Sequence, residues 1–483
     1  METRTESSGL ASVRNHASGH SPITYRFSNV GPVREASLNL GQLTVIAGRN
    51  NTGKTYVVYS LYGFLKQWKD LFSGDQFLAA VPDAKSDCEA IHDGICRTGR
   101  ATVPTSTSTI LKRRQIVADK IGEHSSVLLR RVFNPKRRRF GNARLRIELD
   151  DASANVSPRP LEINFFQGKI RVDFDGEAVV VSMNGFDHPV DPPDLTNFAG
   201  LYCYFIMQDL FPRPFVLTAE RFGISLFFRE LDFTKNQIVN LLQEYASEGR
   251  QKQSRPFLIV DRSTSRYAMP IKDNIDFTRD IPDLPRETSP LGEQKLFDNI
   301  KEMMSGYYSN ATDEIRFISK ARKKGHFNIP LHLASSSARG LVDLYFFLRY
   351  SGDQGQLLII DEPESHLDTA NQVQFARLLA RFVTAGLRVV ITTHSDYILK
   401  ELNNLIMLSR GFPGKSTVMK RLKYRPEDEL RAESVRAYVA ENGGLTECNI
   451  GPFGINMPVF DATIDEINKA TIELASRATT NVA

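Results

Sequence analysis

The stretch Gly48–Thr55, which reads GRNNTGKT, is the feature that most constrains what this 483-residue chain can fold into. It fits the spacing G-x-x-x-x-G-K-[ST], in which the backbone N–H groups of a glycine-rich loop cradle phosphate groups. Such a loop needs a buried strand before it and a helix after it. Residues 43–47 are apolar enough for the strand, and residues 55–72 carry apolar side chains at helical spacing.

The residue types of this loop fit the binding of ATP together with Mg²⁺. Backbone N–H groups at the start of a helix favour negatively charged phosphate oxygens. The Lys54 ammonium places a positive charge on the phosphates, and the Thr55 hydroxyl is a ligand for Mg²⁺. We therefore predict that the following residues bind the nucleotide: Gly48, Asn50, Asn51, Thr52, Gly53, Lys54 and Thr55.

The segment QLLIIDEPESHLD supplies the acidic partner that such a loop requires. Its four apolar residues, 357–360, predict a buried strand that ends at Asp361 and Glu362. Asp361 is expected to hold Mg²⁺ together with Thr55, and Glu362 to orient and deprotonate the attacking water. A strand that merely ends in surface acids is the alternative, and the phosphate loop in the same chain argues against it.

His394 is a third candidate, because it follows the apolar strand and two threonines of VVITTHSDYIL. We predict that it senses the γ-phosphate and steadies the water near Glu362. A single histidine at a strand end is usually a surface or capping residue. Here the chain order of phosphate loop, acidic strand, and strand followed by histidine favours a catalytic role.

This order of motifs resembles that of ABC-type ATPases, a group that includes SMC and RecF-like proteins. Several segments resemble more closely the ATPase part of the overcoming-lysogenization-defect (OLD) family of bacteria. They are QLTVIAGRNNTGKT, PFVLTAERFGI, DEPESHLD, TTHSDYIL and the tail ESVRAYVAENGG. The resemblance covers both ends of the chain and leaves residues 75–190 unassigned. It implies an α/β fold, namely a P-loop ABC-type head with a mixed sheet flanked by helices, carrying an inserted basic, helical segment and an antiparallel β meander.

The resemblance also implies a signature segment that caps the γ-phosphate of a partner subunit in a dimer. The candidate is LASSSARGLVDLYFFL, which precedes the acidic strand. An ordinary serine-rich helix cap is the alternative. Ser337 stands where the family usually has glycine, which puts the tightness of this contact in doubt. The ATP-binding residues implied here are Ser335, Ser336, Ser337 and Arg339.

Full-length OLD nucleases carry a C-terminal Toprim domain, and no matching pair of strands follows His394. The resemblance therefore implies a homodimer or larger homo-oligomer that senses or regulates a separate effector, such as a nuclease, in bacterial anti-phage defence or a toxin-type system. A RecF/SMC-like DNA-repair ATPase is the alternative. The long segment between Lys54 and Asp361 argues against the motor of a membrane transporter. Glu362 argues against a scaffold that only binds ATP.

The charge of the chain is uneven. Residues Arg97–Arg146 hold fourteen Lys and Arg against two acids, a net charge of +12, whereas the whole chain has +5 and the remainder therefore −7. This segment could bind nucleic acid or an acidic partner, or be a solvated loop. Cys88, His92 and Cys96 share one face of a helix, but their spacing fits no known zinc finger and Gly94 weakens the helix.

No apolar run approaches the ~20 residues that a bilayer-spanning helix needs, and the four cysteines show no disulfide spacing. Both observations favour the cytoplasm and argue against a membrane partner. We expect seven units along the chain. They are a disordered N-terminus (1–22), an N-terminal ATPase lobe (23–74), a basic insertion (75–142), an antiparallel β meander (143–190), a helical lobe (191–330), a C-terminal ATPase lobe (331–408) and a tail subdomain (409–483).

Overall fold

The computed structural model describes residues 23–133, 140–150, 158–165, 168–184, 194–228, 267–294, 296–310, 314–321, 325–457, 466 and 468–475. Three predictions fall outside these residues: the disordered N-terminus, the basic run 136–139, and the helical continuation over 229–247. None of the described helices is both long and apolar enough to cross a membrane.

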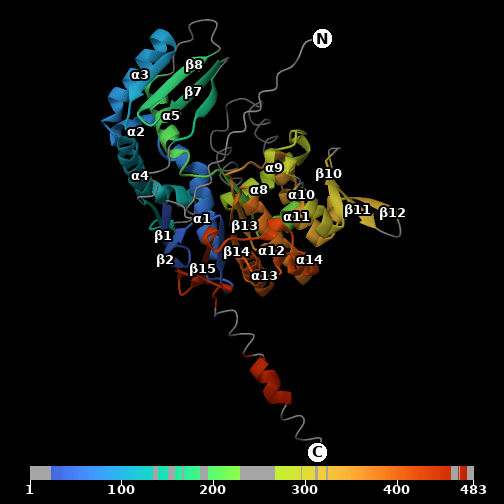
Figure 1. The fold of residues 1–483 in the computed structure, drawn as a ribbon. Coiled ribbons are helices and arrows are strands. Elements are labelled where there is room, and N and C mark those ends of the chain that lie inside the picture. Colours follow the sequence, from blue (N-terminus) through green and yellow to red (C-terminus); the bar gives the residue numbers. More distant parts are fainter. Residues whose placement is uncertain are drawn as a thin grey trace, which may run out of the picture.

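The centre of the fold is a six-stranded sheet (Figure 1). Its strands are β3 (Leu43–Ala47), β9 (Pro214–Leu217), β13 (Leu357–Asp361), β14 (Arg388–Thr393), β15 (Val435–Glu441) and β16 (Gly444–Glu447). They lie in the order β16-β15-β3-β14-β13-β9. All neighbours are parallel except β15 and β16, which form an antiparallel hairpin. The strands β3 and β13 are buried along their whole length, as expected for parallel strands covered on both faces.

Helices cover both faces of this sheet. The helices concerned are α1 (Lys54–Gln67), α11 (Ser336–Phe346), α12 (Thr369–Thr384) and α13 (Asp396–Leu408). The core on the α1 side includes Ile46 and Ile359, and the core that α11, α12 and α13 share includes Val45 and Ile360. Because successive strand residues point to opposite faces, adjacent residues of one strand fill different cores.

The carboxyl ends of β3, β14 and β13 meet at one edge of the sheet. In the strand register, Ala47 lies beside Thr393, and Thr392 lies beside Asp361. The loop after β3, the acids at the end of β13 and the histidine after β14 therefore start from the same place. This parallel arrangement confirms the predicted α/β class and brings the predicted site together.

A three-stranded antiparallel sheet lies over the α1 side, formed by β1 (Ile23–Val30), β2 (Val33–Asn39) and β5 (Arg144–Leu149) in the order β2-β1-β5. The sequence analysis assigned β5 to the meander, but the structure pairs it with β1. The reason is long-range packing: alternate residues of β5, Leu145 and Ile147, are buried in the same core as α1.

The predicted meander is present over β6 (Leu161–Phe165), β7 (Gly168–Phe174) and β8 (Ala178–Asn184), and β4 (Arg100–Pro104) pairs with its last strand. The basic insertion is mainly helical, as predicted. Its helices are α2 (Gly74–Ala80), α3 (Ala84–Thr98) and α4 (Thr107–Phe133), and with the later α5 (Leu195–Met207) they gather at one end of the molecule (Figure 1).

The lobe over 191–330 is less helical than expected. The apolar stretch PFVLTAERF begins as β9, an edge strand of the central sheet, because a short apolar run fits a buried strand as well as a helix. After α8 (Met269–Asp280), α9 (Pro290–Glu293) and α10 (Phe297–Met304), the chain forms a second small antiparallel sheet. Its strands are β10 (Gly306–Ser309), β11 (Arg316–Ala321) and β12 (Gly325–Pro330).

The tail also differs from the expected separate subdomain. Its strand β15 pairs in parallel with β3, so the end of the chain completes the central sheet next to the phosphate loop. Further described tail elements include α14 (Lys415–Leu422), the short 3₁₀ turns η7 (Pro426–Asp428) and η8 (Ala432–Ser434), the strand pair β17 (Ile450–Gly451) and β18 (Gly454–Ile455), and helical residues 468–475.

Candidate functional site

The predicted phosphate loop joins β3 to α1 in a conformation that needs its glycines. Gly48 has φ +152° and Gly53 φ +100°, and a Cβ on Gly48 would come within 2.6 Å of the Ala440 carbonyl oxygen. Positive φ is a region that glycine enters at little cost. The Lys54 side chain lies back across the loop, where its Nζ donates to the carbonyl oxygens of Gly48 and Arg49, each at 2.8 Å.

Lys54 is 5% exposed, and burial lowers the pKa of its ammonium. The carboxylates of Glu362, Asp361 and Glu364 oppose that shift, so the acids of β13 support the charged form of the lysine. The remaining loop residues lie in the same turn: Asn50 and Asn51 are exposed, and the Thr52 hydroxyl donates to the Arg49 carbonyl at 2.9 Å. The seven residues predicted to bind nucleotide in the P-loop thus lie together at the start of α1.

Asp361 and Thr55 face each other below this loop, with the Thr55 hydroxyl 3.4 Å from Asp361 Oδ1. Asp361 is fully buried, and its Oδ1 also accepts a hydrogen bond from the Thr392 hydroxyl. Its Oδ2 is buried and has no hydrogen-bond partner among the described residues. A buried carboxylate oxygen without a donor, next to a hydroxyl, fits a hard cation such as Mg²⁺, which prefers oxygen ligands.

Burial raises the pKa of Asp361 to about 6, against the hydrogen bonds from Thr392 and Thr55 that favour its ionised form. The negative charge of Glu362 and Glu220 adds to the rise. A divalent cation at this position would favour the ionised carboxylate. The residues present therefore fit the metal role that the sequence predicted for Thr55 and Asp361.

Glu362 directly follows β13 and has φ +51°, a left-handed conformation that non-glycine residues rarely adopt. Its N–H bonds to Thr392, to the carbonyl oxygen at 3.2 Å and the hydroxyl at 3.1 Å. Its carboxylate is part-exposed and accepts from the Ser365 hydroxyl at 3.3 Å. Such local strain at a site is held by the surrounding structure and often serves function. Here the residue lies at the edge of the sheet, with its side chain 29% exposed.

His394 lies beside Glu362, with its Nδ1 3.8 Å from Glu362 Oε1. A second carboxylate, which the sequence pattern does not predict for the site, lies closer to this nitrogen. Glu364 Oε1 is 3.2 Å from the same nitrogen, and it also accepts from the His394 N–H at 2.6 Å and from the Thr393 hydroxyl at 2.9 Å. The sequence signal was the third acid of DEPE, Glu364, which is buried here.

The predicted signature segment opens α11 as a capped helix. The Ser335 hydroxyl accepts from the Ala338 N–H at 3.3 Å, and the Ser337 hydroxyl donates to the His366 carbonyl at 2.6 Å. The Arg339 guanidinium donates to the Ala334 carbonyl at 2.7 Å and stacks 4.5 Å from the Phe222 ring centre. None of the hydrogen bonds described for these side chains reaches the phosphate loop of the same chain.

Arg221, in the segment PFVLTAERFGI, is a second residue near the site that the sequence pattern did not predict. It is 3% exposed and donates to the backbone carbonyl of Asp361 at 2.8 Å. Its neighbour Glu220 accepts a hydrogen bond from the Tyr59 hydroxyl of α1 at 3.1 Å. The segment PFVLTAERFGI, which resembles a family motif, therefore lies against β13.

The basic insertion is not uniformly available for binding. Arg113 is buried in α4 and pairs with Asp83 at 3.2 Å and Asp87 at 2.8 Å. Arg114 is buried as well and donates to the Ile206 carbonyl at 2.6 Å. Lys136, Arg137, Arg138 and Arg139 lie outside the described residues. At least two of the fourteen basic residues therefore hold the insertion together.

The Cys88, His92 and Cys96 group does share α3, but its members are not equivalent. Cys88 is buried and Cys96 exposed, and burial raises the pKa of the Cys88 thiol to about 12. Cys96 Sγ lies 3.7 Å from His92 Nε2. Within the described part of the chain, no group of three or more His, Cys, Asp or Glu side chains is arranged to hold a metal ion.

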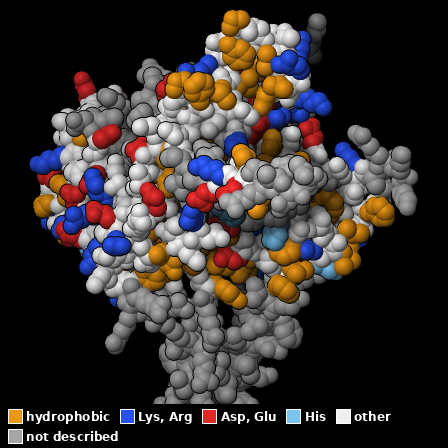
Figure 2. All heavy atoms as spheres, turned by 90° about the horizontal axis from the view of Figure 1, so that it is seen from below, with side chains coloured by type: hydrophobic (Ala, Val, Ile, Leu, Met, Phe, Trp, Pro, Cys, Tyr) orange, Lys and Arg blue, Asp and Glu red, His pale blue; other side chains and the backbone are white. Residues whose placement is uncertain are grey.

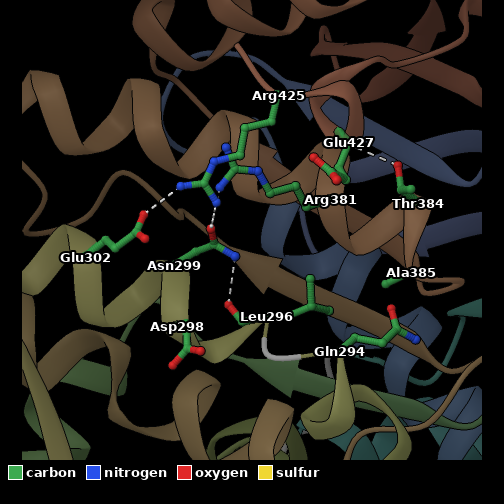
Figure 3. Close-up of a pocket in the computed structure, with 10 residues that line it drawn as sticks. All are labelled: Gln294, Leu296, Asp298, Asn299, Glu302, Arg381, Thr384, Ala385, Arg425 and Glu427. Atoms are coloured by element: carbon green, nitrogen blue, oxygen red, sulfur yellow. Dashed lines mark hydrogen bonds and ion pairs between the residues drawn. The ribbon is translucent and has the colours of Figure 1, made fainter. Parts of the chain in front are cut away.

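A cavity of about 430 Å³ lies away from the nucleotide site, between α10, the end of α12 and η7 (Figure 3). Its two arginines are already engaged: Arg381 bonds to Asp428 at 2.7 Å and Arg425 to Glu302 at 3.0 Å. None of its lining residues comes from the phosphate loop, β13 or β14. The cavity is therefore no part of the candidate site.

One family of known proteins matches a part of this chain. The family described as "AAA ATPase domain" matches residues 231–399, about a third of the chain. The match begins after the phosphate loop and includes the signature segment, the acids of β13 and His394. Residues 231–399 are thus similar to an AAA-type ATPase domain. The search for curated relatives of the ATPase found no match.

Solved structures similar to the ATPase are SMC head domains. The head from Thermotoga maritima has 12% identity and a TM-score of 0.29, covering 89% of this chain and 98% of that one. A head from Pyrococcus furiosus bound to the C-terminal domain of ScpA has 11% identity and a TM-score of 0.31, covering 93% and 99%. A third, bound to the C-winged helix domain of ScpA, has 10% identity and the same score, covering 89% and 97%.

Proposed function

We propose that this ATPase hydrolyses ATP at composite sites formed by two copies of the chain arranged head to tail. The observation that carries the proposal is the shared edge of β3, β13 and β14. There Lys54, Thr55, Asp361, Glu362 and His394 converge on one loop. This set includes a phosphate-binding cation, a pair of oxygen ligands and a part-exposed carboxylate next to a histidine.

Each residue has a distinct task in this proposal. The loop N–H groups and Lys54 bind the phosphates of ATP. Thr55 and Asp361 would hold Mg²⁺, which when bound neutralises charge on the phosphate oxygens. Glu362 accepts the proton of the attacking water, and its carboxylate is part-exposed. His394 holds the neighbouring position from which it can orient the water or the γ-phosphate.

The signature segment supports the dimer. The first turn of α11 carries Ser335, Ser336 and Ser337, and the described bonds of this segment lead to its own helix and to His366. The start of a helix favours an anion. We propose that this turn caps the γ-phosphate held by the P-loop of the partner copy. Neither subunit then hydrolyses ATP alone.

For the biological role, we propose that the dimer senses a signal for, or regulates, a separately encoded effector such as a nuclease in bacterial anti-phage defence or a toxin-type system. The support is the resemblance of the motif segments to stand-alone OLD proteins, which is an argument from analogy. We place the protein in the cytoplasm. Isolation of the tagged chain from its host, followed by identification of copurifying proteins, tests this role. Recovery of the chain without any partner would count against an effector.

The second candidate is a RecF/SMC-like ATPase that binds DNA through Arg97–Arg146, favoured by the +12 charge of that segment. One observation weakens it: Arg113 and Arg114 are buried. On the face of the molecule seen from below in Figure 2, basic and acidic side chains are interspersed. Affinity for DNA that falls steeply with salt would favour this candidate, because each neutralised phosphate releases counterions.

ATP turnover itself gives the direct test of the main proposal. The specific activity of the purified chain should rise with protein concentration and follow the fraction of dimer measured by sedimentation with ATP present. Activity per subunit that is independent of concentration in a protein that stays monomeric would reject the composite site and leave the P-loop assignment intact.

A further inference from the structure

Arg221 connects the turn after β13, which carries Asp361 and Glu362, to the helix α11. Its guanidinium donates five hydrogen bonds, and every acceptor is a backbone carbonyl oxygen. The acceptors are Thr218 at 3.0 Å, Asp361 at 2.8 Å, Glu362 at 2.8 Å, Pro363 at 3.5 Å and Gly340 at 3.2 Å. They belong to three segments: the end of β9, the turn after β13, and α11.

This use of a buried arginine is specific. The guanidinium carries five donors in a rigid planar fork, whereas a lysine ammonium has three donors at one point. Burial lowers the pKa of Arg221, and the charges of Asp361, Glu364, Glu362 and Asp343 oppose the shift. The described hydrogen bonds nevertheless go to the backbone. Nearby carboxylates balance the positive charge of Arg221, while its N–H donors hold the backbone of the three segments in place.

On one side, Arg221 holds the turn that presents the catalytic acid. Two of its shortest bonds are to the carbonyls of Asp361 and Glu362, on either side of the left-handed φ of +51°. A non-glycine residue in that region costs on the order of 1–3 kcal/mol and persists only where its surroundings hold it. The arginine is one such restraint, and the bonds of the Glu362 N–H to Thr392 are another.

On the other side, Arg221 holds α11 through the Gly340 carbonyl, one turn beyond Ser336. A second buried connection runs in parallel. Asp343 of α11 accepts from Asn274 Nδ2 at 2.7 Å, and Asn274 Oδ1 accepts from the N–H and the hydroxyl of Thr218, each at 3.1 Å. The carbonyl of the same Thr218 is an acceptor of Arg221. The turn of Glu362 and the start of α11 are therefore held as one unit.

We infer that Arg221 is a positioning residue that couples the nucleotide state of a subunit's own P-loop to the position of its α11, which serves the partner's nucleotide. Glu362 and Asp361 respond to nucleotide bound in the same chain, and Arg221 transmits their position to the helix that faces the other chain. The inference rests on the proposed composite dimer. It assigns the guanidinium no contact with the substrate.

The test compares dimerisation with and without nucleotide. Sedimentation of the full chain gives the dimer dissociation constant alone and with a non-hydrolysable ATP analogue plus Mg²⁺, and analogue affinity is measured on dilute monomer. In the intact protein the analogue should tighten the dimer; coupling between two sites is typically about 5- to 150-fold. In Arg221→Lys we expect analogue affinity within about twofold of the intact protein, and loss of most of that tightening, since Lys donates to fewer carbonyls.

Arg381→Lys is the matched control. Arg381 is also a buried arginine, bonded to Asp428 at 2.7 Å, but it lies at the cavity of Figure 3 and touches none of the acceptors of Arg221. Its replacement should lower the unfolding temperature and leave nucleotide-dependent tightening unchanged. A second variant, Arg221→Gln, keeps two donors without the charge and is measured in parallel.

The outcomes are distinct. Tightening in Arg221→Lys or Arg221→Gln equal to that of the intact protein overturns the inference. So does a failure of both variants to fold while Arg381→Lys folds, because Arg221 would then be structural. An intact protein whose dimerisation ignores the analogue rejects the proposed composite dimer instead.

Discussion

Glu364 Oε1 lies 3.2 Å from His394 Nδ1, closer than the 3.8 Å that separates the same nitrogen from Glu362. The Glu364 carboxylate thus lies within ion-pair distance of the imidazole ring. Glu364 is 6% exposed and has donors from Thr393 and the His394 backbone as well. This buried acid is therefore placed to orient His394 beside the part-exposed Glu362.

Glu364→Ala should consequently slow ATP hydrolysis and leave ATP binding nearly unchanged. His394 loses the acceptor that orients it. In metal sites, loss of the partner that orients a histidine typically lowers metal affinity or activity about 10- to 100-fold, and we expect a similar loss of ATP hydrolysis here. Steady-state turnover and analogue titration separate the two quantities. Glu427→Ala, which removes a carboxylate at the remote cavity, is the control. Full turnover by Glu364→Ala would show that His394 needs no such support.

Lys54→Ala should abolish tight ATP binding. Its Nζ bridges two loop carbonyls and is the cation that the loop itself supplies to the phosphates. Calorimetric titration with ATP and Mg²⁺ measures the effect directly. Lys66→Ala serves as the control, because Lys66 lies at the far end of the same helix and pairs with Asp273 at 3.7 Å. ATP affinity within a factor of two of the intact protein would remove the P-loop assignment.

Glu362→Gln should bind ATP but hydrolyse it about 10²–10⁴-fold more slowly, the usual cost of losing a general base. The amide keeps the shape of the side chain and can still accept from Ser365, while it cannot take a proton. Sedimentation should show dimers that accumulate with ATP. Unchanged hydrolysis would mean that the base lies elsewhere, and His394 would then be the next residue to replace.

Local sequence pattern was enough to predict which residues come together at the candidate site, but not the residues that support them. The P-loop, Asp361, Glu362 and His394 each belong to a strand end, and parallel pairing of β3, β14 and β13 then brings them together without further information. The supporting roles of Arg221 and Glu364 could not be predicted from local pattern. Their roles depend on which carbonyls and side chains meet them from distant segments.

The same dependence on contacts between distant segments explains the errors in the predicted fold. The strand β9 is a short apolar run that fits strand and helix equally, and only its pairing with β13 decides. The strand β15 was assigned to a separate tail because nothing local signals that it completes the central sheet beside β3. Similarly, charge alone could not show that Arg113 and Arg114 are turned into the core.

Asp343 predicts a pH-dependent stability. Burial raises its pKa to about 7, although Thr278, Asn274 and Arg221 favour the ionised form. The Thr278 hydroxyl lies 2.9 Å from the Asn274 carbonyl and 3.0 Å from Asp343 Oδ1. With one proton it cannot donate to both, so a protonated Asp343 can donate to it.

An aspartate ionises near pH 4 in the unfolded chain, whereas Asp343 keeps its proton up to about pH 7 in the folded protein. Its contribution to the free energy of unfolding is therefore full below pH 4 and lost as the pH rises to 7, by at most about 1.4 kcal/mol per pH unit. Asp343→Asn mimics the protonated form. Its stability relative to the intact protein, measured by urea unfolding, should increase from pH 4.5 to pH 7. A difference that does not change with pH would contradict the raised pKa.

Ser336→Glu tests the composite site. Ser336 is the first residue of α11, where an acid is compatible with the helix dipole, so the fold should tolerate it. The new carboxylate would, however, repel the γ-phosphate that a partner's P-loop brings to this turn. We expect ATP binding to the subunit's own P-loop to persist while hydrolysis and ATP-dependent dimerisation stop. Ser336→Gln has the same size without the charge and should retain more activity.

Mixing two inactive proteins gives the decisive version of this test. A head-to-tail dimer of one Lys54→Ala subunit and one Ser336→Glu subunit carries both lesions in one composite site and leaves the other site intact. Some hydrolysis should therefore return on mixing, provided that one intact site turns over. A mixture of Lys54→Ala and Glu362→Gln subunits should not recover hydrolysis. Both residues act on the nucleotide of their own subunit, so each composite site of the mixed dimer carries one of the two lesions. Full activity of Ser336→Glu alone would contradict the model, because the helix start would then have no role at a partner's phosphate.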